Sequence, residues 1–162
     1  MRILGLDPGT ATTGYGIIDV VEGEPSVVAY GVIRTEPQQA MAQRLQIIYR
    51  ALCELLDEYR PDAAAIEEVF FGRNITTAIT VGQARGVLLL ALANAGVPIE
   101  EYSPPKIKDA VTGYGKADKH QVQLMVRNLL HLEETPRPDD AADGLAVALT
   151  HFQHQRYSSL LS

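Results

Sequence analysis

The order of strand-like and helix-like segments constrains the fold of this chain most strongly. Three short apolar segments come first and are separated by tight turns, which predicts an antiparallel meander. They span residues 2–6, 15–20 and 26–33. Helical and strand patterns then alternate, and three helices complete the chain. The alternating segments are a helix at 40–59, a strand at 62–69, a helix at 74–95 and a strand at 97–102. Of the last three helices, a short one begins near residue 103, and the others span 117–130 and 138–152. This order predicts an α/β protein with a mixed five-stranded sheet, three antiparallel strands then parallel ones, and helices on both faces.

Length and composition exclude several classes of protein. The 162 residues suit one domain, 1–162, with a short C-terminal tail after about residue 153. The single cysteine, Cys53, forms no internal disulfide, and Asp7 comes too early for a signal peptide. The longest apolar run, residues 87–93, is too short to span a bilayer. We therefore expect a cytoplasmic protein without a membrane partner. The net charge of −6 argues at first against nucleic acid as well.

Carboxylates follow the predicted elements in an unusual pattern. Asp7 ends the first strand, Glu67 and Glu68 end the fourth, and Asp140 and Asp143 share one face of the last helix. Each has a structural explanation as a turn former, a solvated strand end or a favourable charge at a helix N-terminus. Their apolar surroundings instead favour a hard divalent cation such as Mg²⁺ or Mn²⁺. Two such ions about 3.5–4 Å apart form the arrangement that cuts phosphodiesters.

Spacing alone leaves two ligand assignments open. Glu67 and Glu68 point to opposite faces of a strand, so only one of them enters the site. Asp139 is four residues from Asp143 and shares its helix face as readily as Asp140 does. The histidines show no metal-binding spacing, and His151 and His154 are expected as surface residues or helix-dipole partners.

Four motifs in register resemble the RuvC family of bacterial Holliday-junction resolvases. They are Leu4-Gly5-Leu6-Asp7-Pro8-Gly9-Thr10 with Thr13-Gly14-Tyr15-Gly16, then Ala65-Ile66-Glu67-Glu68-Val69-Phe70, Gly82-Gln83-Ala84-Arg85-Gly86-Val87 and Asp140-Ala141-Ala142-Asp143-Gly144-Leu145-Ala146. The resemblance implies a ribonuclease H-like fold, a homodimer, two Mg²⁺ ions per site (Mn²⁺ substituting), cleavage of four-way junctions and cooperation with the branch-migration proteins RuvA and RuvB. It selects Asp7, Glu67, Asp140 and Asp143 as the metal ligands.

The same resemblance implies a set of DNA contacts. Phe70 matches the family's base-stacking position, Arg73 a backbone contact, and Lys108 and Lys119 lysines near the scissile phosphate. Phe71 is equally explained by stacking on an unpaired base or by core packing. Lys106 and Lys116 complete the lysines of the chain, all within residues 102–132, whose net charge is +3. This local charge reverses the first argument against a DNA partner.

The helix at 74–95 has two explanations. Small residues at Ala78, Gly82 and Gly86 beside a long apolar run suit a dimer interface, and a wholly buried core helix explains the run equally well. Two other functions remain as alternatives. An Asp-x-Gly-Thr turn also opens the phosphate-binding hairpin of actin-like ATPases, and a non-catalytic junction-binding protein is the third possibility.

Overall fold

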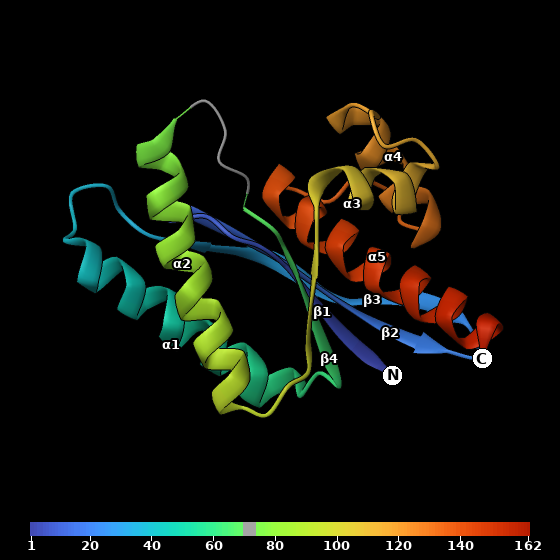
Figure 1. The fold of residues 1–162 in the computed structure, drawn as a ribbon, viewed down its shortest axis with the longest axis horizontal. Helices are drawn as coiled ribbons and strands as arrows, with labels where there is room; N and C mark the ends of the chain where they lie inside the picture. The colour runs from blue at the N-terminus through green and yellow to red at the C-terminus, as the bar shows by residue number, and fades with distance from the viewer. Residues whose placement is uncertain (70–73) are drawn as a thin grey trace.

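A five-stranded mixed sheet forms the centre of the protein (Figure 1). The computed structural model describes residues 1–69 and 74–162. The antiparallel meander consists of β1 (Arg2–Asp7), β2 (Thr12–Val21) and β3 (Glu24–Arg34). Parallel to β1 lies β4 (Ala63–Glu67), followed by β5 (Ile99–Tyr102), so the order across the sheet is β3-β2-β1-β4-β5. The predicted sheet is therefore present.

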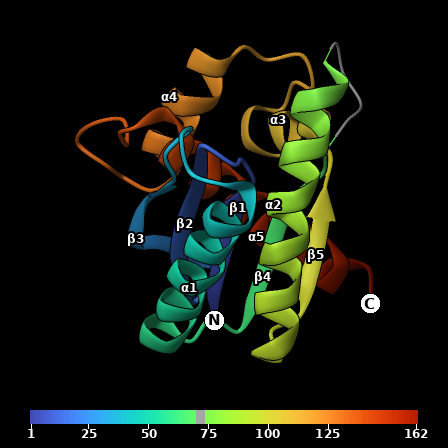
Figure 2. The same cartoon turned by 90° about the vertical axis from the view of Figure 1, so that its left-hand side faces the viewer.

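Helices cover both faces of this sheet (Figure 2). One face carries α1 (Met41–Tyr59) and α2 (Ile75–Asn94). The other carries α5 (Asp139–Leu161), on which α3 (Pro104–Thr112) and α4 (Lys119–Leu129) pack. Successive residues of β1 serve the two cores in turn: Ile3 belongs to the cluster under α5, and Leu4 to the cluster under α1 and α2. Burial on both faces explains why this strand is an almost continuous apolar run.

Close backbone contact joins α5 to the first two strands. A Cβ added at Gly5 would overlap the backbone of Gly144 and Ala148, and one added at Gly16 would overlap Leu145. Only residues without a side chain allow the helix to approach the strands so closely. The contact continues to the start of α5, because a Cβ at Gly14 would overlap the carbonyl oxygen of Asp140. These glycines therefore set the position of the first turns of α5.

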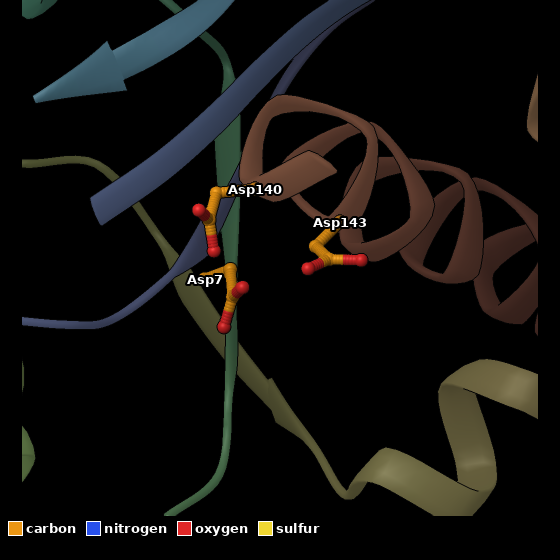
Figure 3. Close-up of side chains that lie close together, drawn as sticks. All are labelled: Asp7, Asp140 and Asp143. Carbon is orange, nitrogen blue, oxygen red and sulfur yellow. The ribbon is translucent and has the colours of Figure 1, made fainter. Parts of the chain in front are cut away.

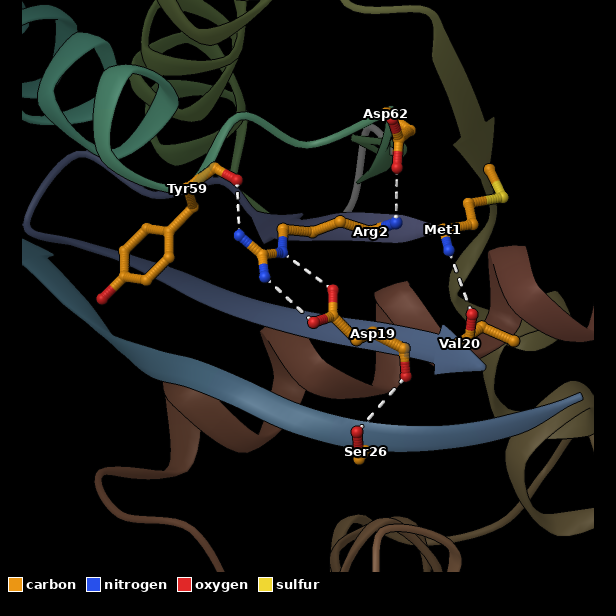
Figure 4. Close-up of polar contacts among 7 residues, drawn as sticks. All are labelled: Met1, Arg2, Asp19, Val20, Ser26, Tyr59 and Asp62. Atoms are coloured by element: carbon orange, nitrogen blue, oxygen red, sulfur yellow. Dashed lines mark hydrogen bonds and ion pairs between the residues drawn. The ribbon is translucent and has the colours of Figure 1, made fainter. Parts of the chain in front are cut away.

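Polar contacts join the N-terminus to β2, to the end of α1 and to Asp62 (Figure 4). The Arg2 guanidinium donates to both oxygens of Asp19 at 2.8 and 2.9 Å and to the carbonyl of Tyr59 at 2.8 Å. The Arg2 N–H donates to Asp62 at 2.7 Å, just before β4. The hydrogen bond from Arg2 outweighs the opposing effect of burial and lowers the pKa of Asp19. One side chain thus links β1, β2 and the end of α1.

The structure corrects several predicted boundaries, among them the start of the second strand, which lies at Thr12 and not at residue 15. The strand predicted at 62–69 ends at Glu67, and the one predicted at 97–102 begins at Ile99. The last helix continues to Leu161, so the helix end predicted at 152 is wrong. The prediction ended the helix where its apolar pattern stops. Residues 153–161 contain neither glycine nor proline, so nothing local ends the helix there.

Candidate active site

Three aspartates from distant parts of the chain meet at the carboxyl end of the central strand β1 (Figure 3). Asp7 is the last residue of β1, and Asp140 and Asp143 lie in the first two turns of α5. Carboxylate oxygens of the three residues lie within 4.8 Å of one another. Asp7 pairs with Gly14 across the β1–β2 ladder, and Gly14 packs on the backbone of Asp140. The glycine contact thus brings the helix aspartates to the strand end.

Glu67, on the neighbouring strand, lies beside Asp7 but is not among the three residues whose oxygens meet within 4.8 Å. β4 runs parallel to β1, and its Ile66 pairs with Leu6, so Glu67 and Asp7 lie side by side at the carboxyl ends of the two strands. Glu67 and Asp143 line a cavity of about 250 Å³ with Lys108 and Lys119, between the strand ends, α3, α4 and α5. Glu68 does not line this cavity, and its N–H donates to the Tyr102 carbonyl at 2.8 Å.

Burial of these carboxylates makes their negative charges unfavourable. Burial, with smaller contributions from Glu67 and Asp140, raises the pKa of Asp7 to about 8. Burial and the neighbouring Asp7 raise the pKa of Asp143 to about 7, although Lys119 opposes the shift. Burial also raises the pKa of Glu67. A divalent cation would compensate these charges, and an all-oxygen donor set matches Mg²⁺ or Mn²⁺. The residues present therefore fit such an ion.

Two lysines bring positive charge to the same cavity. Lys108 lies on α3, which Ser103 caps by accepting the N–H of Lys106. Lys119 begins α4, where Asp118 and Gln121 form a capping box. The Lys119 Nζ lies 3.6 Å from an oxygen of Asp143. Burial lowers the pKa of Lys119, but the surrounding carboxylates outweigh burial and raise it. Lys119 therefore stays charged beside the carboxylate cluster.

The other predicted DNA contacts lie elsewhere or outside the described residues. Lys106 lines a different cavity, of about 390 Å³, with its Nζ 5.6 Å from the centre of the Tyr102 ring. Lys116 is exposed between α3 and α4. The predictions for Phe70, Phe71 and Arg73 concern residues 70–73, which lie outside the described part of the chain.

Two features of this region were not anticipated. Asp139, over which the resemblance had selected Asp140, lies outside the three-aspartate cluster, but its ion pairs with Arg137 and Lys119 were not predicted. His151 was expected as a surface residue or a helix-dipole partner, but it is only 4% exposed and lies in the middle of α5, with its Nδ1 2.8 Å from the Tyr102 hydroxyl. Burial lowers the pKa of His151. The apolar run around it, residues 144–150, was the available signal that this helix face is buried.

Comparison with known proteins identifies the family. The family model described as crossover junction endodeoxyribonuclease RuvC matches residues 3–151. The chain belongs to the RuvC family. It is 55% identical to RuvC of Syntrophomonas wolfei over 161 residues, covering 99% of this chain and 94% of that protein. It is 57% identical to RuvC of Heliobacterium modesticaldum over 149 residues, covering 92% of each.

Solved RuvC structures agree with this assignment. Thermus thermophilus RuvC superposes with a TM-score of 0.91 at 40% identity, covering 98% of this chain and 97% of that one. The same protein in complex with a Holliday junction substrate gives 0.92 at 39% identity, with the same coverage. The predicted family, the ribonuclease H-like α/β class and the assignment as a crossover junction endodeoxyribonuclease are confirmed. An actin-like module and a non-catalytic binding protein are not favoured.

Proposed function

We propose that this protein resolves four-way DNA junctions by paired symmetric nicks during homologous recombination and DNA repair. The observation that carries the proposal is the meeting of Asp7, Asp140 and Asp143 at the edge of a RuvC fold, with Glu67 beside them. The Thermus thermophilus relative in complex with a Holliday junction substrate supports the choice of substrate. Each cut leaves a 5′-phosphate and a 3′-hydroxyl.

The four carboxylates would hold the metal ions, two Mg²⁺ per site with Mn²⁺ able to substitute. When bound, such ions activate a water and stabilise the leaving oxygen of an in-line displacement. Asp7 and Glu67 come from adjacent strand ends, and Asp140 and Asp143 from a helix packed against those strands. These rigid elements hold the oxygens in place before the metal and the DNA arrive, which reduces the reorganisation needed at the site.

The lysines act on the DNA rather than on the metal. Lys108 and Lys119 line the cavity with Glu67 and Asp143, so their ammonium groups can bind the scissile phosphate and stabilise its developing charge. Lys106 and Lys116 extend the positive charge along α3 and the α3–α4 connection, where they would contact the DNA backbone. Arg73, Phe70 and Phe71 would contribute the backbone and stacking contacts near the cut.

Paired cutting requires two active sites, and we assign the dimer interface to α2. Although Leu88 and Leu92 are buried, Ile75, Ile79 and Leu90 are 70%, 55% and 55% exposed. The explanation of α2 as a wholly buried core helix is therefore wrong. Space around Gly82 and Gly86 is open: a Cβ added at either would meet nothing within 4 Å.

By length and composition α2 could also cross a membrane, but one such helix is weak evidence, because core helices of soluble proteins have the same properties. A two-fold dimer would match the symmetry of the junction. Cooperation with RuvA and RuvB in the bacterial cytoplasm completes the proposal.

A cleavage assay tests the function. The protein is incubated with a synthetic mobile four-way junction and Mg²⁺, and the nicks are mapped on all four strands. We expect symmetric paired nicks that Asp7→Asn abolishes while junction binding persists. Asp57→Asn is the matched control, since Asp57 is exposed on α1. Binding without cleavage under Mg²⁺ or Mn²⁺ would refute the nuclease, and ATP hydrolysis without junction binding would favour the actin-like alternative.

A further inference from the structure

Asp139 occupies a distinct place beside the catalytic cavity. It is the first residue of α5, next to the proposed ligand Asp140, but its carboxylate lies outside the three-aspartate cluster. Its two oxygens face two different cations. Oδ1 accepts from Arg137 Nη1 at 3.2 Å, and Oδ2 lies 4.0 Å from Lys119 Nζ. The carboxylate therefore pairs with both cations at once.

We propose that Asp139 is a positioning residue that holds the Lys119 ammonium at the catalytic cavity. This inference rests on the proposed function and assigns Asp139 a role in the same reaction. Lys119 has two carboxylate neighbours within 4.0 Å, Asp143 at 3.6 Å and Asp139 at 4.0 Å. Asp143 belongs to the cluster that fits a divalent ion, and a cation there would weaken its attraction for Lys119. Asp139 lies outside the cluster, so a divalent cation there would weaken its attraction for Lys119 less.

The backbones on both sides of this pair are well anchored. Lys119 is the first residue of α4, and the Asp118–Gln121 capping box fixes that helix start with hydrogen bonds of 2.8 and 2.9 Å. Asp139 is the first residue of α5, whose next turns contact the sheet through Gly14 and Gly144. Because both backbones are fixed, the distance between the two charges changes only when one of the side chains rotates. Attraction to the Asp139 carboxylate therefore favours the orientations of Lys119 that keep its ammonium near the cavity.

A purely structural role for Asp139 predicts different results. Negative charge at a helix N-terminus is favourable in itself, so losing it could lower stability without affecting Lys119. The pair is also substantially exposed, with side chains 58% and 44% accessible, so its effect is modest. We expect Asp139→Asn to lower the cleavage rate about threefold, because exposed ion pairs contribute up to about 1 kcal/mol, or roughly a factor of five.

The test is a double-mutant cycle on single-turnover cleavage of the junction in Mg²⁺. The variants are wild type, Asp139→Asn, Lys119→Met and the double variant, with Asp139→Glu to test rescue and Glu134→Gln as an exposed charge-matched control. Junction affinity is measured in parallel without divalent metal. We expect a slower Asp139→Asn, no further loss from it when Lys119 is already Met, and recovery with Asp139→Glu. Affinity should be unchanged or tighter, because the substitution removes a negative charge near the DNA.

Three outcomes overturn the inference. They are an undiminished rate in Asp139→Asn, an equal loss from Asp139→Asn in the Lys119→Met background, and an equal loss in Glu134→Gln. Failure of the wild type to cut any junction would instead refute the proposed function, so the two failures are distinguishable.

Discussion

Replacing Asp7 by asparagine should make the metal-free protein more stable at high pH while removing its activity. The folded pKa of Asp7 is raised from 3.8 to about 8, mainly by burial. Between these values the folded state binds more protons than the unfolded state, so the free energy of unfolding falls as pH rises from about 4 to 8. Asparagine has nearly the same shape and carries no charge. The variant should therefore lack this part of the pH dependence.

The size of the effect follows from the shift. A change of about four pKa units corresponds to roughly 5 kcal/mol for full ionisation of Asp7 in the folded protein. Glu67 and Asp143 share the site and also have raised pKa values, so their ionisation still lowers the free energy of unfolding of the variant at high pH. We expect a gain on the order of 2 kcal/mol at pH 9, or about 4–8 °C in Tm for a chain of this length.

Thermal unfolding in a chelator at pH 5, 7 and 9 measures this gain for wild type, Asp7→Asn and the control Asp57→Asn. The advantage of Asp7→Asn over wild type should grow from pH 5 to 9 and be absent in the control. Mg²⁺ should then stabilise wild type, by about 2.7 kcal/mol at one hundred times its Kd, and Asp7→Asn less. A difference between Asp7→Asn and wild type that does not change with pH would refute the reasoning, as would equal stabilisation of both by Mg²⁺.

Three further substitutions test other parts of the structure. Gly14→Ala should lower Tm and abolish cleavage, since its Cβ would overlap the carbonyl oxygen of Asp140 and displace the helix; wild-type Tm and cleavage would contradict this. Ile79→Glu should shift the sedimentation mass toward the 17.7 kDa monomer, whereas a wild-type that is itself monomeric at micromolar concentration would refute the α2 interface. Arg2→Met should cost about 1–3 kcal/mol in denaturant unfolding, because it removes the charge-assisted bonds to Asp19, and an unchanged midpoint would show that these bonds contribute little.

The chain of elements was largely predictable because its signals are local. Apolar alternation and turns placed the strands, and Asn74 and Ser103 both cap helices where the sequence suggested helix starts. Family motifs then selected Glu67 and Asp140 from the adjacent acids. Boundaries were less predictable where no glycine or proline marks them. The last helix is an example: it ends at Leu161, nine residues past the predicted end at 152.

The sequence by itself determined the order of strands and helices, the family and the residues proposed to carry the chemistry. Only the tertiary structure decided how those residues face one another. It placed the oxygens of Asp7, Asp140 and Asp143 within 4.8 Å and turned Asp139 toward Lys119, which is twenty residues away in the sequence. Such distances depend on how closely a helix approaches a sheet. Here glycines on both elements set that approach, and their effect exists only when the two surfaces meet.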